Sequence, residues 1–236
     1  MAPDEAAAEA SESAPSWREQ AVARSLDPAR ARAENRVQRF LDAALELMNT
    51  ASDKEFTVQE VVERSGQSLR SFYQYFAGKH ELLLALFEEA VRWSVDRLQE
   101  AVAEEDVPLE RLHRFAVEYY RLCRPVPDNR RSKKSPSPAA LADFAQQLMT
   151  AHPDEAARAY APLVSLFEEL LDGAAAAGAI RADLNHRRIA GVVLQAIMFN
   201  VFSSTISGTP TRAAGETGAE GLWDLLLRGI GSGSAR

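Results

Sequence analysis

The chain has a single cysteine, Cys123, among its 236 residues, so no disulfide can form within it. A lone thiol agrees with a reducing cytoplasm. The chain also lacks an uninterrupted apolar run of the roughly 20 residues that span a bilayer, because polar residues break up the most apolar segment, 189–206. Residues 1–16 are acidic and lack the basic and apolar regions of a secretory signal. We therefore expect a cytoplasmic protein without a membrane partner.

Excess positive charge is missing as well, since the formal net charge is −7. This total does not exclude a nucleic-acid partner, because DNA binding depends on where the positive charges lie. Between residues 17 and 39 the chain holds six arginines against three acidic residues. Two interpretations stay open for this segment: a solvated helix that leads into the fold, or a basic extension that contacts the DNA backbone.

Residues with catalytic or metal-binding chemistry are few and scattered. His80, His113, His152 and His186 show no metal-ligand spacing such as H-E-x-x-H, and no glycine-rich phosphate loop is present. Cys123 has no histidine near it in sequence, which favours a small apolar core residue over a thiol sensor. We predict no catalytic residue, no metal ligand and no cofactor, and therefore not an enzyme.

Apolar residues recur at three- and four-residue spacing through most of the chain, which predicts an all-α fold. No segment alternates apolar and polar residues convincingly enough to predict a strand. Residues 124–138 are basic and rich in proline and serine, as in a loop. The expected helices are 35–50, 57–66, 68–75, 79–103, 108–123, 139–151, 153–177, 186–206 and 219–230.

The segment 57–83, TVQEVVERSGQSLRSFYQYFAGKHELL, is the most informative. Thr57-Val-Gln-Glu60 is a capping-box pattern that predicts a helix start, and Ser68 can cap the following helix. Gly66 permits the turn between them. Two short helices joined in this way form a helix-turn-helix, whose second helix can lie in a major groove. Any corner between two helices can show this much, so the pattern alone indicates DNA binding only in general terms.

The residues 66–83 also follow the order Gly-x-Ser-x-x-Ser-Phe-Tyr-x-Tyr-Phe-x-Gly-Lys-x-x-Leu-Leu. This order resembles the recognition-helix signature of the TetR family of bacterial transcriptional regulators, and the resemblance covers about residues 35–90. It implies a three-helix N-terminal helix-turn-helix head at 31–80 and a C-terminal helical ligand-binding and dimerisation domain at 81–236. Residues 1–30 would form a flexible arm. Gln67 and Arg70 depart from the small residues common in the family, and Phe56 stands in a loop without the usual glycine.

The resemblance implies DNA contacts along the second and third helices. Arg70 can form two hydrogen bonds with guanine, and Leu69 can pack on a thymine methyl group. Tyr73, Tyr75 and Lys79 match positions that contact phosphates, as does Thr57, which opens a helix where free amides favour an anion. The alternatives are core packing for the tyrosines, a solvated side chain for Arg70 and a plain helix start for Lys79. The expected DNA-binding residues are Thr57, Ser68, Leu69, Arg70, Ser71, Tyr73, Gln74, Tyr75 and Lys79.

The resemblance further implies an effector pocket between the middle helices and a dimer interface on the last two. The expected ligand-binding residues are Trp93, Phe115, Tyr119, Phe144, Met149, Leu163 and Phe167. The expected interface residues are Ile189, Val193, Ile197, Asn200, Trp223 and Leu226. Burial within the monomer is the alternative for both sets.

The function implied by the resemblance is a homodimeric regulator that binds a near-palindromic site in double-stranded DNA. We expect a repressor that a small apolar or amphipathic ligand releases from its operator. Two alternatives remain: a helical protein-interaction module with a degenerate DNA-binding head, and a cryptic helical enzyme.

Overall fold

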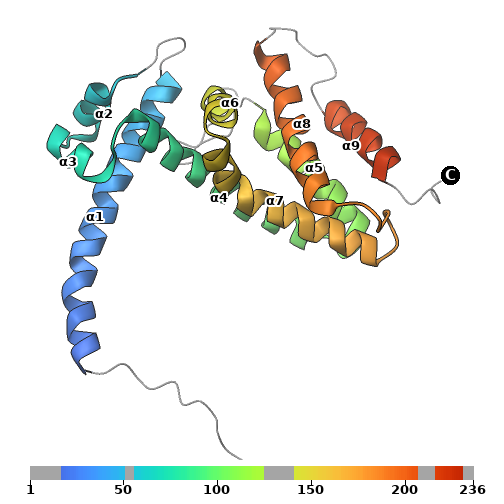
Figure 1. Ribbon diagram of the computed structural model, residues 1–236, viewed down its shortest axis with the longest axis horizontal. Coiled ribbons are helices and arrows are strands. Elements are labelled where there is room, and N and C mark those ends of the chain that lie inside the picture. Colours follow the sequence, from blue (N-terminus) through green and yellow to red (C-terminus); the bar gives the residue numbers. More distant parts are fainter. Residues whose placement is uncertain (1–16, 51–55, 125–140, 207–215, 231–236) are drawn as a thin grey trace, which may run out of the picture.

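The computed structural model describes residues 17–50, 56–124, 141–206 and 216–230, and the regular elements in these ranges are helices. The all-α expectation is confirmed. Figure 1 shows an elongated molecule in which α1–α3, here called the head, lie at one end and α5, α8 and α9 lie toward the other, with α4 running between them and α6 near the middle. The elements are α1 (Trp17–Thr50), α2 (Val58–Ser65), α3 (Leu69–Tyr75), α4 (Lys79–Ala103), α5 (Pro108–Cys123), α6 (Ala142–Ala151), α7 (Pro153–Ala176), α8 (His186–Ile206) and α9 (Glu216–Ile230).

Helix α1 is longer than the sequence predicted, because it begins at Trp17 rather than near residue 35. It therefore includes residues 17–30, which were assigned to the arm; residues 1–16 lie outside the described part. Only its C-terminal part packs in the head, through buried residues such as Phe40 and Ala44. The N-terminal part projects away from the rest of the molecule (Figure 1). An exposed ion pair between Arg30 and Glu34, at 2.8 Å, supports this projecting part.

Three aromatic rings hold the head together. Phe40 of α1 meets Phe72 and Phe76 edge-on, with ring centroids 5.4 and 6.2 Å apart. All three side chains are buried. Edge-to-face pairs have a preferred geometry in addition to the apolar area that they bury. The cluster therefore fixes the angle at which α3 stands on α1.

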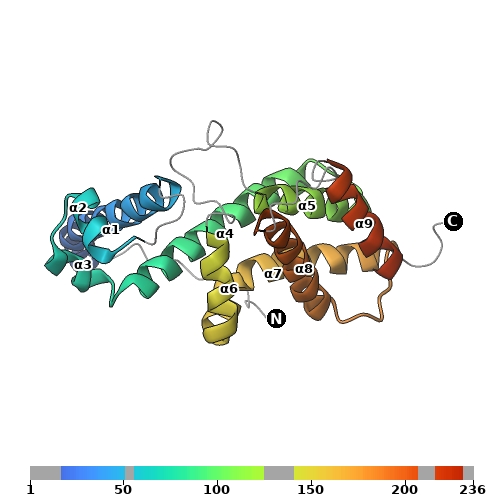
Figure 2. The same ribbon diagram turned by 90° about the horizontal axis from the view of Figure 1, so that it is seen from above.

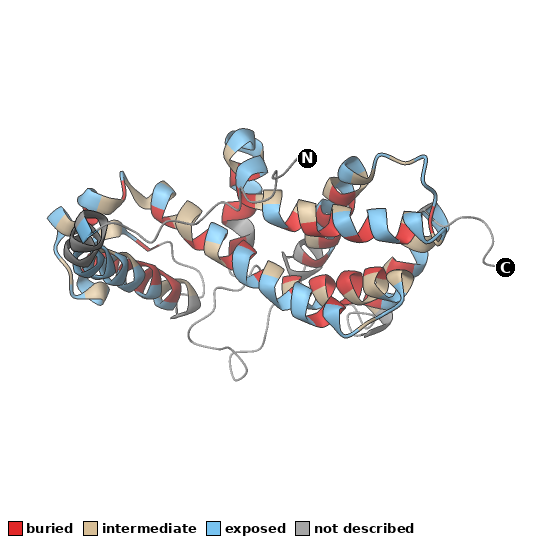
Figure 3. Ribbon diagram, turned by 90° about the horizontal axis from the view of Figure 1, so that it is seen from below, coloured by how far each residue is buried: buried red, intermediate tan, exposed pale blue. Residues whose placement is uncertain are grey.

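The rest of the core lies between α4, α5, α7 and α8. Helix α4 packs against α1 near its start and against α5 and α7 along its length, and α7 also packs against α8 and α6. Helix α9 packs against α5. Figure 2 shows the same arrangement from above, and Figure 3 shows it from below, with buried positions on the helix faces turned toward one another. Phe115 and Phe167 stack at the centre, 4.5 Å apart. Among the described helices, none combines the length and apolar character needed to cross a bilayer.

Candidate DNA-binding head and ligand cavity

The start of α2 has the capping box that the sequence predicted. The Thr57 hydroxyl accepts a hydrogen bond from the Glu60 amide at 3.2 Å, and the Thr57 amide donates to the Glu60 carboxylate at 2.7 Å. Helix α2 ends at Gly66, which has a left-handed φ of 64° and whose amide donates to carbonyls of the last turn. The Ser68 hydroxyl then caps α3 by accepting from the Ser71 amide at 3.1 Å. The local geometry of a helix-turn-helix is confirmed.

Helix α3 exposes one face and buries the other. Leu69 is 43% exposed and Tyr73, one turn later, is 58% exposed, whereas Phe72 between them is fully buried. Arg70 and Gln74 are exposed beside this pair, as is Ser68 before them. Four of the predicted DNA-contacting side chains on α3 therefore share an open surface that no described residue covers.

Other predicted DNA-binding residues lie differently. The Ser71 hydroxyl is buried and has no hydrogen-bond partner among the described residues, so a contact with a base edge would require this side chain to turn outward. Tyr75 is half-buried against the core. Lys79 is the first residue of α4, and its ammonium lies 4.7 Å from the centroid of the Phe56 ring in a cation–π contact.

The Thr57 position has an acidic neighbour that an incoming phosphate would meet. The Thr57 hydroxyl donates to the Glu60 carboxylate at 2.9 Å in addition to accepting from the Glu60 amide. A phosphate bound at these amides would have to displace that carboxylate. The head as a whole is nearly neutral, because residues 30–80 hold eight Lys and Arg against seven Asp and Glu. One of the basic groups, Arg64, is paired with Glu46 at 3.2 Å.

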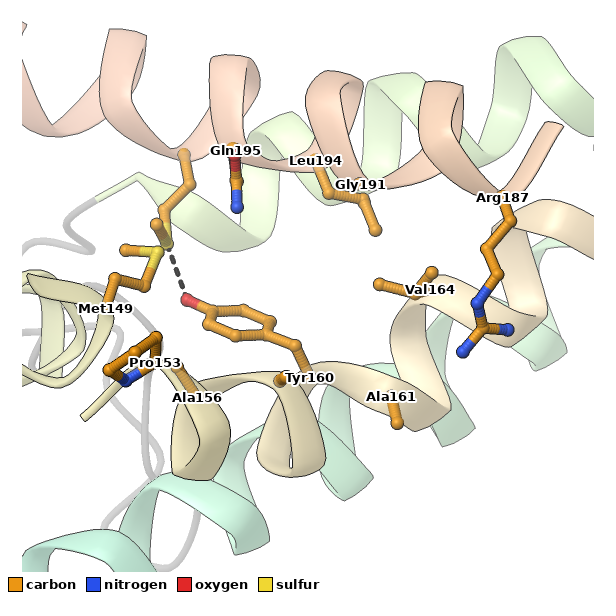
Figure 4. A pocket seen from close by; sticks show the side chains of 12 residues that line it. Met149, Pro153, Ala156, Tyr160, Ala161, Val164, Arg187, Gly191, Leu194 and Gln195 are labelled. Carbon is orange, nitrogen blue, oxygen red and sulfur yellow. Dashed lines mark hydrogen bonds between the residues drawn. The ribbon is translucent and has the colours of Figure 1, made fainter. Parts of the chain in front are cut away.

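A cavity of about 340 Å³ lies between α7 and α8, close to the end of α6. Figure 4 shows Tyr160 reaching across it, and the Tyr160 hydroxyl lies 2.8 Å from the Met198 sulfur. Arg187 stands at one end, paired with Glu168 at 3.0 Å. The cavity is lined by Met149, Pro153, Ala156, Ala157, Tyr160, Ala161, Val164, Arg187, Gly191, Leu194, Gln195 and Met198.

Of the predicted ligand-binding residues, only Met149 lines this cavity. Trp93 is 37% exposed on α4, away from it. The others are buried in the core: Phe115, Tyr119, Phe144, Leu163 and Phe167. Large apolar side chains were expected at the ligand, but the open space arises where the facing helices carry small side chains. The sequence signal for this space is the pair Ala157 and Ala161, one turn apart on α7, together with Gly191 on α8.

The predicted interface residues are divided between the core and the surface. Val193, Ile197 and Trp223 are buried within the monomer, and Ile189 and Leu226 are half-buried. Asn200 is exposed. The large apolar side chains that do face outward are their neighbours: Val192 at 59% exposure and Phe199 at 37% on α8, and Leu225 at 68% on α9.

Cys123 lies in the core, next to Tyr119. Burial raises the pKa of the Cys123 thiol to about 12. A thiol in this environment is protonated near neutral pH and is a poor nucleophile. The position agrees with the interpretation of Cys123 as an apolar core residue.

Comparison with known proteins agrees with this geometry. Residues 40–86 match the model of a family described as bacterial regulatory proteins, tetR family. A TetR-family transcriptional regulator from Pectobacterium atrosepticum has a similar structure, with a TM-score of 0.65 and 18% identity over 86% of this chain and 97% of that chain. No curated protein matches significantly.

Two fatty-acid regulators share the fold at comparable levels. FadR from Bacillus halodurans, a fatty acid degradation regulator, gives a TM-score of 0.63 at 18% identity over 81% of this chain and 94% of that chain. FadR from Thermus thermophilus, a TetR-family repressor in complex with lauroyl-CoA, gives 0.61 at 20% identity over 85% and 96%. The helix-turn-helix segment therefore matches the model of the TetR family, and the fold of the chain is similar to that of solved TetR-family regulators.

Proposed function

We propose that the protein is a cytoplasmic, homodimeric repressor that binds a near-palindromic operator and leaves it when a small amphipathic ligand binds. The observation that supports DNA reading most directly is the open face of α3. Leu69, Arg70 and Tyr73 stand on it, and the buried Phe72 fixes its orientation. Such a face presents a bidentate donor for guanine and an apolar contact for thymine, in a helix short enough to enter a major groove.

The outward apolar side chains support a dimer through α8 and α9. Val192 and Phe199 are seven residues apart and therefore share one face of α8, and Leu225 faces outward from α9. A two-fold interface there would duplicate the head, and helix-turn-helix dimers place their recognition helices about 34–36 Å apart on DNA. One copy of α3 contacts too few base pairs for a selective site, so duplication supplies the missing specificity.

The cavity between α7 and α8 is the candidate effector site. Its volume of about 340 Å³ and its apolar lining suit an acyl or other hydrocarbon chain. Arg187 at its end supplies a charged donor for a carboxylate or phosphate group. Similar structures hold stearoyl-CoA and lauroyl-CoA. We propose a ligand with an apolar chain and an acidic group. It would act by binding more tightly to the state that does not fit the operator.

The decisive variant carries Arg70→Ala and Tyr73→Ala. We expect operator affinity to fall sharply, since Arg70 would lose a base contact that contributes about 1–3 kcal/mol of discrimination and Tyr73 would lose a phosphate contact. Fluorescence anisotropy with operator DNA measures the loss, and analytical ultracentrifugation measures the oligomeric state. Arg97→Ala removes an exposed arginine of α4 outside the head and should change neither quantity. Unchanged operator binding by the double variant would favour an interaction module with a degenerate head.

A further inference from the structure

Two of the four histidines come together where the fold joins the head to the cavity. His80 lies in the first turn of α4, directly after the recognition helix, and His152 lies at the corner between α6 and α7. Their rings are 4.5 Å apart, with an interplanar angle of 41°. They are 72 residues apart in sequence, so no spacing pattern could have placed them together.

Glu155 completes the cluster with one carboxylate oxygen toward each ring. One of its oxygens lies 2.8 Å from His80 Nε2, and the other lies 3.8 Å from His152 Nδ1. His152 is the residue before α7, Pro153 begins that helix, and Glu155 follows in the first turn. The corner therefore holds His152 and Glu155 close together by local geometry, and packing brings α4 to them. All three side chains are partly exposed, so solutes can reach them.

We infer that His80, His152 and Glu155 form a binding site for a divalent transition-metal ion, with zinc as the best match. Two imidazoles and one carboxylate are borderline ligands that suit zinc, whereas calcium and magnesium prefer oxygen alone. Three protein ligands leave one position of a tetrahedral ion for water. The three donor atoms lie within 4.8 Å of one another.

The spacing of the donor atoms fits such an ion after small adjustments. Tetrahedral zinc with bonds of about 2.0–2.1 Å holds neighbouring ligand atoms roughly 3.3 Å apart. The 2.8 Å contact with His80 and the 3.8 Å contact with His152 are made by different oxygens of Glu155, so an ion would take one of these oxygens or both. One donor atom from each residue lies within 4.8 Å of the others, and rotation of the partly exposed side chains would have to bring these atoms closer.

The remaining histidines lack this convergence. The two ring nitrogens of His113 face different carboxylates, Glu220 at 2.8 Å and Glu110 at 3.9 Å. These groups lie on opposite edges of the ring and cannot meet at one ion. His186 has Asp172 on one nitrogen and the Arg181 carbonyl on the other. Both residues therefore serve as controls that are matched in type and in having an acidic partner.

The position of the cluster gives the ion a further consequence, which rests on the proposed function. Pro153 and Ala156 line the cavity, and the two ligands His152 and Glu155 are their neighbours in sequence. His80 follows the recognition helix by only a few residues. An ion bound here ties the wall of the cavity to the base of the head. In the dimer, the bound ion thereby favours those separations of the two heads in which α4 and α7 stay joined at this cluster.

The test titrates metal-free protein with zinc against a chromophoric chelator, without DNA. We expect one zinc per chain in the wild type and in His113→Ala. The pair His80→Ala with His152→Asn should lose more than about 100-fold in affinity, beyond the 10–100-fold typical of removing an outer-shell partner. Asparagine is a favoured residue at the start of a helix, so the variant should fold, which circular dichroism checks. Equal zinc affinity in this variant and in the wild type, or no zinc bound by either, would overturn the site.

The coupling is measured separately, by operator titration with and without zinc. We expect operator affinity to change at least about fivefold in the wild type, the lower end of measured coupling between sites. The His80→Ala and His152→Asn pair should show no change with zinc. A wild-type protein that binds zinc and keeps the same operator affinity would overturn the coupling. Because zinc binding is read without DNA, failure of operator binding would count against the proposed function only.

Discussion

At the scale of single residues, the backbone at Gly66 determines how α3 leaves α2. Its φ of 64° is in the left-handed region, where side chains with a Cβ are disfavoured. A Cβ added there would meet no atom within 4 Å, so crowding adds nothing to the cost of a substitution. A substitution at Gly66 therefore changes the stability of the protein through backbone conformation alone.

Gly66→Ala should destabilise the protein by about 1–2 kcal/mol, the cost of forcing a Cβ into the left-handed region. Chemical denaturation with urea measures this difference. Gly66→Asn is the matched control and should cost less, because asparagine tolerates that conformation. Equal losses for the two variants would show that the strain lies elsewhere.

His186, the first residue of α8, gives the protein a predictable pH dependence. Its hydrogen bond to the Asp172 carboxylate, at 2.6 Å, raises the pKa of the His186 imidazole above its ordinary value. A raised pKa in the folded state adds stability that is fully present below the unfolded pKa of about 6.5 and is lost as the pH rises through the folded pKa.

The difference in unfolding free energy between wild type and His186→Gln should therefore be largest at acidic pH, where the wild-type ring is charged, and should shrink above the folded pKa. Urea titrations across this range measure it. Asp172→Asn should abolish the same pH dependence. A difference that stays constant with pH would contradict the role given to this pair.

At the scale of elements, α8 uses three faces for three purposes. One face carries the core residues Ala190, Val193 and Ile197, and a second carries Gly191 and Met198 at the cavity. The third face turns Val192 and Phe199 outward. The sequence shows a helix that is apolar on all sides, and only the packing against α7 and α5 assigns each residue to a face.

Replacing Val192 and Phe199 with aspartate should shift the protein from dimer to monomer while the monomer stays folded. The new charges would be buried without partners in the dimer but solvated in the monomer. Analytical ultracentrifugation measures the mass, and circular dichroism measures the fold. Val193→Asp, one residue away, should instead unfold the chain, because Val193 is in the core. If the double variant remains dimeric, the dimer interface lies on another surface and the proposed α8 interface is wrong.

With lauroyl-CoA as the probe for the proposed effector site, Arg187→Gln should weaken binding by about tenfold or more, because hydrogen bonds to charged groups contribute about 1.5–3 kcal/mol. Isothermal titration calorimetry measures the affinity. Arg188→Gln is the matched control, since Arg188 is the next residue of α8 and does not line the cavity. Equal affinities of the wild type and Arg187→Gln for the ligand would show that Arg187 does not bind it.

Features that depend on interactions between residues close in sequence could be predicted, and features that depend on residues far apart in sequence could not. The capping box at Thr57 and the turn at Gly66 depend on neighbours a few residues away, and the local residue pattern reveals them. The cavity and the His80–His152 cluster depend on which helices pack together, which no local pattern records. For the same reason the large side chains expected at a ligand, such as Phe115, are in the core instead.

At the scale of the whole molecule, α4 connects the head to the helices that form the proposed effector cavity. Its 25 residues span about 37 Å at 1.5 Å per residue. It packs against α1 of the head at one end and against α7, which forms one wall of the cavity, farther along. A ligand that shifts α7 can therefore tilt α4 and change the separation of two heads, provided that it binds the two states with different affinity.

The measurement that tests the central claim most directly is selection of genomic DNA fragments by the purified protein, followed by anisotropy titration of the selected site at several salt concentrations. We expect a near-palindromic sequence bound by two chains or a multiple of two. Affinity should be at least about 1,000-fold above that for random DNA and should fall steeply as salt rises. Selection that enriches no sequence above random DNA would contradict the regulator account.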